Sequence, residues 1–328
     1  MSFRENIIKA RGNLIFLAAL ICGLLLVTTL ERNMPSTPET ADGADAPTEV
    51  SAPIAIAAPI TAFEEVEPLP LANTGQSKPH DLDYARIAWR YFENNTNPDT
   101  GFVNSADQYP STTMWETGSY FIAVISADLL GIIETEEAVE RLGLALDTLA
   151  SIRLFDDMLP NKAYNTSTAE LVDYSNQPVE RGLGWSALDI ARMVGAMSHA
   201  EQSYPELAAK VDAVIDHWDL DQMVENGELV GGNIAEGNLR RDQEGRVGYG
   251  QYGAKAMMLR GFDMVLAYNA EAHLMVQNVE GQPIPVDDRL HRNITPAFTV
   301  SEPYVFDGLE FGFDYRSHRF ATAIYLAQ

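Results

Sequence analysis

Acidic side chains lie close to aromatic rings at several points along this sequence. A flat ring and a carboxylate are what a protein needs to hold a sugar and to cleave its glycosidic bond. The groups are Trp115 with Glu116, Asp173 with Tyr174, Trp185 with Asp189, Glu244 beside Arg246 and Tyr249, and Glu302 with Tyr304. Their succession along one segment of the chain indicates a protein that binds or cleaves a carbohydrate.

Glu116 is the first candidate for a catalytic acid or base. It lies in the first turn of a predicted helix that is otherwise almost wholly apolar. Burial among apolar side chains raises the pKa of a carboxyl group, as a general acid requires. The structural alternative is a favourable charge near the N-terminus of that helix. The candidates for a second catalytic carboxylate are Asp189, Asp173 and Glu244.

The candidates for sugar binding are the aromatic and polar residues beside these acids. Trp185 and Asp189 are one helical turn apart and would share a face, forming a stacking platform with a hydrogen-bonding carboxylate. Alternatively, Trp185 is a core residue and Asp189 pairs with Arg192. The other candidates are Trp115, Tyr174, Arg246, Tyr249, Glu302 and Tyr304. Their structural alternatives are turns, helix ends and a local pair between Glu244 and Arg246.

Several other classes of protein are disfavoured. The chain has a net charge of −25, with 47 acidic and 22 basic residues, which opposes binding to nucleic acid. The histidines have no spacing typical of metal ligands, and no glycine-rich phosphate loop or G-x-S-x-G motif occurs. We therefore expect no metal, no cofactor and no serine nucleophile.

The N-terminal part has the composition of a membrane anchor followed by a linker. Residues 13–30 are apolar and uncharged, and a helix needs about 20 such residues to cross a bilayer. Basic residues within 1–12 precede this stretch and place that end in the cytoplasm. The expectation is a single-pass signal-anchor in the inner membrane, with a cleaved signal peptide as the alternative. Residues 31–80, rich in Pro, Ala and acids, are predicted to be a disordered linker.

The remaining residues, 81–328, have mainly helical periodicity. Nearly all-apolar helices alternate with amphipathic ones, which predicts an inner layer covered by an outer layer, as in an α/α toroid. A bundle is the alternative, and the absence of a fixed repeat opposes a solenoid. Helices are expected at 82–94, 114–130, 134–153, 185–201, 205–218, 249–263, 303–312 and 315–327. Short β-hairpins are expected in the irregular segments 154–183 and 267–300.

The motifs of this domain resemble those of a bacterial family, the domain of unknown function 3131. The resemblance covers about 84–328 and rests on the segments YPSTTMWE, LPNKAYN, LVDYSNQP, GWSALDIAR, QEGRVGYGQY, IPVDDR and SEPYVFDGLE. It implies a mainly α fold of the six-hairpin (α/α)6 glycosidase group, which includes endo-β-1,2-glucanases. One departure is Glu116, where that family usually has Asp.

The resemblance and the residues together predict a glycoside hydrolase-like protein that acts on a neutral glucan or exopolysaccharide, outside the inner membrane. The predicted helices are fewer than a complete six-hairpin toroid contains. An incomplete toroid, or one that a partner protein completes, is therefore part of the expectation. The alternative function is a non-catalytic polysaccharide-binding or assembly subunit, or an inactive truncated homologue.

Overall fold

The computed structural model describes residues 60–71, 77–269, 272–289 and 300–328. The chain divides into two units, Met1–Ile54 and Ala55–Gln328, and all described residues belong to the second. The helices are η1 (Ile60–Phe63), α2 (Pro79–Asn95), α3 (Met114–Leu129), α4 (Thr135–Leu149), α5 (Ala187–Ser203), η2 (Pro205–Leu207), α6 (Ala208–His217), η3 (Leu220–Met223), α7 (Tyr249–Met258), α8 (Val265–Asn269), α9 (Glu302–Phe306), the π-helical turn η4 (Asp307–Phe311) and α10 (Tyr315–Ala327).

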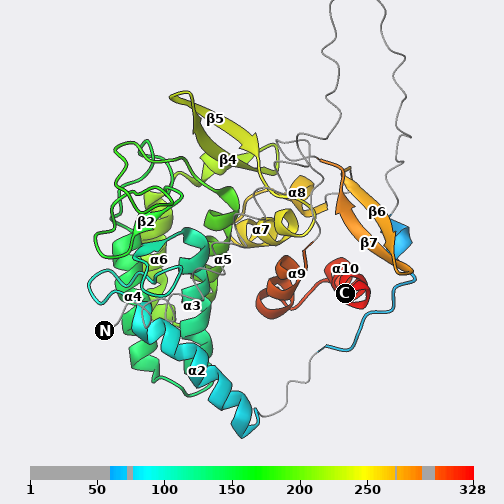
Figure 1. Ribbon diagram of the computed structural model, residues 1–328, viewed down its shortest axis with the longest axis horizontal. Coiled ribbons are helices and arrows are strands. Elements are labelled where there is room, and N and C mark those ends of the chain that lie inside the picture. The colour runs from blue at the N-terminus through cyan, green and yellow to red at the C-terminus, as the bar shows by residue number, and fades with distance from the viewer. Residues whose placement is uncertain (1–59, 72–76, 270–271, 290–299) are drawn as a thin grey trace, which may run out of the picture. The chain divides into compact units, whose positions relative to one another are not determined.

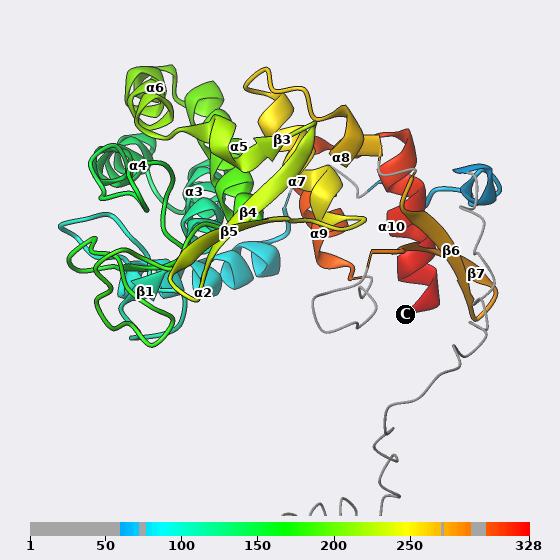
Figure 2. The same cartoon turned by 90° about the horizontal axis from the view of Figure 1, so that it is seen from above.

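Three small antiparallel sheets accompany the helices. Their strands are β1 (Ser111–Thr112) and β2 (Tyr164–Asn165), then β3 (Val224–Glu225), β4 (Glu228–Ala235) and β5 (Asn238–Gln243), and finally β6 (Leu274–Val279) and β7 (Gln282–Asp287). The pairing β1–β2 fixes the segment that leads into α3 against the loop that follows α4. The hairpin β4–β5 packs on α5 and α7 (Figures 1 and 2).

The helices form the two layers that the periodicity predicts. Helix α5 packs on both α3 and α7, whereas α4 and α6 pack on each other and on the outer side of α3 and α5 (Figure 2). Apolar residues cover most of the surface of α3 and α5, so both are buried on several sides. Helix α4 has an apolar stripe and an acidic face, as an outer-layer helix should.

Small residues allow the inner helices to approach closely. A Cβ atom at Gly118 of α3 would lie 3.3 Å from the Arg192 side chain and 3.4 Å from the Met193 backbone of α5. A Cβ atom at Gly195 of α5 would lie 3.1 Å from Ala256 of α7. Larger side chains at these crossings would push the helices apart, and with them the residues at their N-termini.

A second hydrophobic cluster joins the two ends of the described chain. Phe63 is 1% exposed and its ring lies 4.6 Å from that of Phe320 in α10. The Leu69 amide also donates to Thr322 Oγ1 at 3.1 Å. The prediction of a disordered linker over 31–80 is therefore wrong for residues 60–71, because aromatic burial against α10 stabilises them. Residues 31–59 and 72–76 lie outside the described part of the chain.

Most predicted helices are confirmed, with shifts at their ends. Helix α2 begins earlier than expected, at Pro79, and α5 begins later, at Ala187. The segment predicted at 303–312 is interrupted by the π-helical turn η4. The predicted hairpin in 267–300 is confirmed as β6–β7, but the longer hairpin β4–β5 was missed. Within the described residues no helix is long and apolar enough to span a bilayer, and the expected anchor at 13–30 lies outside them.

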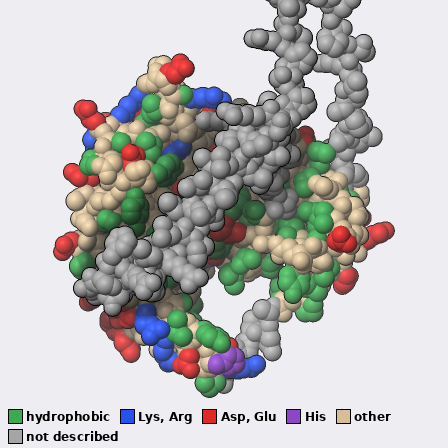
Figure 3. Space-filling view, viewed as in Figure 1, with side chains coloured by type: hydrophobic (Ala, Val, Ile, Leu, Met, Phe, Trp, Pro, Cys, Tyr) green, Lys and Arg blue, Asp and Glu red, His purple; other side chains and the backbone are tan. Residues whose placement is uncertain are grey.

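The surface is rich in acidic groups. Acidic side chains recur around the face seen in Figure 3, in keeping with the net charge of −25. Apolar side chains gather over the region of α9 and α10 in the same view, where Val305, Leu309, Tyr325 and Leu326 are exposed.

Candidate active site

The N-termini of α3 and α5 carry the same arrangement of a capping hydroxyl followed by an acid. Thr113 caps α3, accepting a hydrogen bond from the Trp115 amide at 3.1 Å and donating to Glu116. Ser186 caps α5, accepting from the Asp189 amide at 3.2 Å, with its hydroxyl 2.9 Å from Asp189 Oδ1. A hydroxyl cap with an acid three residues later is a common helix start. Because α3 and α5 pack together, the charge of Glu116 acts on Asp189.

Asp189 is the middle group of a cluster of three carboxyl groups. The hydroxyl of Thr113 hydrogen-bonds Asp189 as well as Glu116. The hydroxyl of Ser186 lies 2.9 Å from Asp189 Oδ1 and 2.7 Å from Glu244 Oε1. Two capping hydroxyls therefore link Glu116, Asp189 and Glu244 in a row.

The environment of Asp189 favours its neutral form. Burial raises its pKa to about 7, and the negative charges of Glu244 and Glu116 act in the same direction. The hydrogen bonds from Ser186 and Thr113 oppose this effect but do not outweigh it. A carboxyl group that exchanges its proton near neutral pH suits general acid–base catalysis.

Glu244 is held by hydrogen bonds to the N-terminus of helix α5. Its Oε2 accepts the Ala187 amide hydrogen at 2.7 Å, while its Oε1 lies 2.7 Å from the Ser186 hydroxyl. Both oxygens are thus engaged by the first residues of α5, where the helix dipole stabilises a negative charge. Glu244 therefore lies in the cluster, but its contacts are those of an anchoring group.

Tyr174 projects from the loop that adjoins the three acids. Its side chain is 67% exposed, and burial of its hydroxyl together with the charges of Asp189, Glu244 and Glu116 raises its pKa. Tyr109 donates a hydrogen bond to the Tyr174 carbonyl at 3.2 Å. An exposed ring whose hydroxyl feels the charges of all three acids is well placed to contact a sugar bound beside these acids.

Asp173 shapes this loop. Its Oδ1 accepts the amide hydrogens of Ser175 and Gln177, at 2.8 and 2.9 Å. This is an Asx-type turn, in which a carboxylate replaces a backbone acceptor. The structure thus gives Asp173 the turn-forming role that was the alternative to catalysis, and it displays Tyr174.

Trp115 lies beside Glu116 on top of a buried arginine. The Arg192 guanidinium is 2% exposed, 4.8 Å from the Trp115 ring and 3.9 Å from the Phe306 ring. It pairs with Glu310 Oε1 at 3.1 Å and donates to the Tyr252 hydroxyl at 2.7 Å. The alternative pairing of Asp189 with Arg192 is therefore not formed, because Arg192 pairs with Glu310 of η4 instead.

Tyr249 and Glu302 continue this surface at the other edge of Trp115. The Tyr249 ring packs edge-on against Trp115 at 5.7 Å, and its hydroxyl donates to Glu302. Both residues were predicted to bind sugar, and the structure brings them next to Trp115.

Two of the predicted stacking residues are wrong because they are buried. Trp185 is 0% exposed; it extends under β4, exchanging backbone hydrogen bonds with Gly232 and donating from Nε1 to the Val230 carbonyl at 2.8 Å. Tyr304 is 4% exposed and belongs to the cluster of Phe63 and Phe320. Neither ring is available to a sugar.

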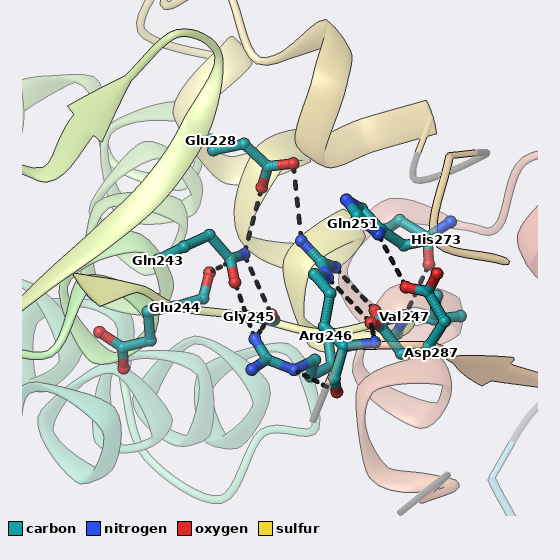
Figure 4. Close-up of polar contacts among 12 residues, drawn as sticks. Glu228, Gln243, Glu244, Gly245, Arg246, Val247, Gln251, His273 and Asp287 are labelled. Atoms are coloured by element: carbon teal, nitrogen blue, oxygen red, sulfur yellow. Dashed lines mark hydrogen bonds and ion pairs between the residues drawn. The ribbon is translucent and has the colours of Figure 1, made fainter. Parts of the chain in front are cut away.

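Arg246 takes part in a separate polar network, shown in Figure 4. Its Nη1 donates to Gln243 Oε1 at 2.7 Å and to the Gly245 carbonyl at 2.6 Å, while the Glu244 carboxylate points away from it. The local pair of Glu244 with Arg246 is therefore not formed. The network orders the loop that carries Glu244, so the contribution of Arg246 is indirect.

The buried centre of this network is the ion pair of Asp287 with Arg289. Two hydrogen bonds join these side chains, at 2.8 and 2.7 Å, and Val247 donates its amide hydrogen to Asp287 at 2.8 Å (Figure 4). Burial acts to raise the pKa of Asp287, but the hydrogen bonds and charge of Arg289 lower it overall. The pair attaches the end of β7 to the loop after Glu244.

Sequence reasoning missed Thr113, Ser186 and Glu310, and it did not foresee that Arg192 pairs with Glu310. The first two carried a usable signal, since T-x-x-E and S-x-x-D are both helix-start patterns. Arg192 and Glu310 carried none, because their pairing depends on contact between α5 and η4. The Asp307 and Glu310 side chains are 5% and 4% exposed.

Comparison with solved structures finds similar folds among carbohydrate-active proteins. A putative glucoamylase from Bacteroides uniformis matches with a TM-score of 0.54 and 14% identity over 77% of this chain and 66% of its own. An endo-β-1,2-glucanase from Chitinophaga pinensis, in complex with sophorotriose and glucose, matches with a TM-score of 0.51 and 11% identity over the same shares. A β-1,2-glucanase from Parabacteroides distasonis has a TM-score of 0.37, 18% identity, and 48% and 24% coverage.

This chain therefore spans just under two thirds of the first two structures and about a quarter of the third. At these identities the likeness shows the fold, which is that of the (α/α)6 six-hairpin glycosidases. No curated protein matches the chain. The model of one family, described as "Protein of unknown function (DUF3131)", matches residues 83–328. The chain belongs to the DUF3131 family.

Proposed function

We propose that this protein is a glycoside hydrolase that cleaves a neutral glucan or related exopolysaccharide, with Glu116 and Asp189 as its two working carboxyl groups. The observation that carries the proposal is the meeting of these acids at the adjoining N-termini of α3 and α5. One hydroxyl, that of Thr113, touches both of them. Similarity to a fold found in a glucanase and a putative glucoamylase supports the same reaction class.

The two acids differ in the way that such a reaction requires. Glycosidases use one carboxyl group to protonate the leaving oxygen and another, ionised, as base or nucleophile. Asp189 has its pKa raised to about 7 by burial, so it holds a proton in mildly acidic and neutral solution. The Glu116 carboxylate, which accepts a hydrogen bond from Thr113 at the N-terminus of α3, is proposed as the base or nucleophile.

Aromatic groups near the acids would hold the sugar. Trp115 packs against Tyr249, and Tyr174 lies in the loop beside the three acids. Rings of this kind stack on the apolar faces of sugar rings. A neutral substrate is favoured because three carboxyl groups and a net charge of −25 repel polyanionic chains. The location outside the inner membrane, through the segment 13–30, is part of the same proposal.

Release of reducing ends tests this function. The full chain is incubated with a panel of neutral β-glucans, including β-1,2-linked chains, and bacterial exopolysaccharides. We expect Glu116→Gln and Asp189→Asn each to lower kcat by at least 100-fold while sugar affinity changes little. The matched control is Glu225→Gln, an exposed acid on β3.

Full turnover by either variant would refute the assignment of that acid. Binding without turnover by the unmodified chain, lost on replacing Trp115 or Tyr174 by alanine, would instead favour the binding-subunit alternative.

A further inference from the structure

The three acids and the two hydroxyls beside them have fewer hydrogens than oxygen–oxygen contacts. The hydroxyls of Thr113 and Ser186 have a single hydrogen each, yet each lies against two carboxyl groups. Both hydroxyl oxygens already accept an amide hydrogen as helix caps. Two hydrogens therefore serve four oxygen–oxygen contacts, and every contact of the middle acid competes with an outer acid.

The outer acids, Glu116 and Glu244, are better placed than Asp189 to accept the two hydroxyl hydrogens. Thr113 directs its hydrogen to Glu116. Glu244 makes the shorter contact with Ser186, 2.7 Å against 2.9 Å for Asp189. Its other oxygen accepts the Ala187 amide hydrogen at the start of α5, so both oxygens of Glu244 are engaged as hydrogen-bond acceptors. If both hydroxyl hydrogens point outward, Asp189 receives neither.

A proton on Asp189 supplies a third hydrogen to this group of contacts. The protonated carboxyl group can donate to Ser186, whose oxygen faces it at 2.9 Å. The titratable side chains that act on Asp189 are Glu244 after β5, Glu116 on α3 and Tyr174 in its loop. The charges of Glu244 and Glu116 oppose a negative charge on Asp189, whereas Tyr174, whose pKa is raised by burial, carries no charge near neutral pH.

We propose that Ser186 and Glu244 are positioning residues that keep the proton on Asp189: Ser186 gives its hydrogen to Glu244 and accepts one from the Asp189 carboxyl group. The use of this proton in glycan cleavage rests on the proposed function. The location of the proton does not, and it can be measured without a substrate.

The experiment is a pH titration of the full chain with ¹³C-labelled aspartate side-chain carboxyls, followed by NMR. The Asp189 signal is identified by its absence in Asp189→Asn. Glu244→Gln is the first variant. Its amide oxygen can still accept the Ala187 hydrogen, but its amide nitrogen must donate to Ser186, which turns the Ser186 hydrogen toward Asp189. We expect the acid dissociation constant of Asp189 to rise at least tenfold in Glu244→Gln and to stay unchanged in Glu225→Gln.

Ser186→Ala distinguishes the two possible directions of the hydrogen bond between Ser186 and Asp189, because they predict opposite changes in the acidity of Asp189. If Ser186 accepts the Asp189 proton, removal of the hydroxyl makes Asp189 a stronger acid. If Ser186 instead donates to an ionised Asp189, the same change makes Asp189 a weaker acid. A weaker acid in Ser186→Ala, or no change in Glu244→Gln, overturns the proposal, as does a wild-type Asp189 that titrates like an exposed aspartate. Because Ser186→Ala removes a helix cap, circular dichroism first checks its fold.

Failure of the proposed function would look different. In that case no glycan is cleaved, while the titration of Asp189 and its response to Glu244→Gln remain as expected.

Discussion

Replacing Asp189 with asparagine should stabilise the fold in alkaline solution and have little effect in strong acid. Asparagine has the shape of a protonated aspartic acid but cannot ionise. In the folded chain burial, aided by the charges of Glu244 and Glu116, raises the pKa of Asp189 from 3.8 to about 7. The neutral form therefore contributes stability that is fully present below pH 3.8 and is lost as the pH rises through about 7.

The expected change in the free energy of unfolding follows from the pKa shift of Asp189. One pKa unit corresponds to about 1.4 kcal/mol, so ionising Asp189 costs the folded state up to about 4 kcal/mol above pH 7. Between pH 5 and pH 9 the change is smaller, about 3 kcal/mol, because the unfolded chain is already ionised at pH 5. Asparagine removes this dependence on pH.

Urea unfolding of the full chain, followed by tryptophan fluorescence, measures the effect. The free energy of unfolding of Asp189→Asn, relative to wild type, should increase by about 3 kcal/mol on going from pH 5 to pH 9. Asp221→Asn, at an exposed aspartate, is the control and should give the same difference at both pH values. An equal difference at both pH values for Asp189→Asn, or a loss of stability that grows with pH, would refute the buried, proton-holding Asp189.

Three further predictions concern the groups that support the site. Arg192→Leu should destabilise the fold by about 3–5 kcal/mol in urea unfolding, because it leaves the Glu310 charge buried and unpaired. Gly232→Ala should lower stability by about 1–3 kcal/mol and alter tryptophan fluorescence, since its Cβ atom would overlap the Trp185 ring. Asp287→Asn should destabilise at neutral pH and progressively less in acid, because the lowered pKa of Asp287 gives stability that is lost as the pH falls through it.

The layered helical fold could be predicted because it depends on local pattern. The apolar surface of α3 and the acidic face of α4 are properties of their own residues. Glu116 and Asp189 could be selected for a similar reason, since each lies in the first turn of a helix. What placed the two acids side by side is the crossing of α3 and α5 at Gly118, which no single segment specifies.

The failed predictions concern side chains whose environment is formed by distant segments. The sequence pattern predicts that a helix begins at Trp185. Instead, the hairpin β4–β5, which was not predicted, covers Trp185 and forms backbone hydrogen bonds with it. Phe63 is one aromatic residue in a polar, proline-rich stretch, and its burial depends on Phe320 near the other end of the chain. Neither contact can be inferred from the composition of one segment of the chain.

The placement of both proposed acids at helix starts explains how a strongly acidic chain can hold three carboxyl groups together. The N-termini of α3 and α5 supply amide hydrogens and positive dipole ends, which offset the charge of the outer pair, Glu116 and Glu244. The middle acid, Asp189, also lies in the first turn of α5, but burial and the charges of the two outer acids raise its pKa to about 7. Because Glu244 also anchors the start of α5, loss of activity on its replacement would not by itself make it catalytic. Only its effect on the ionisation of Asp189 separates the two roles.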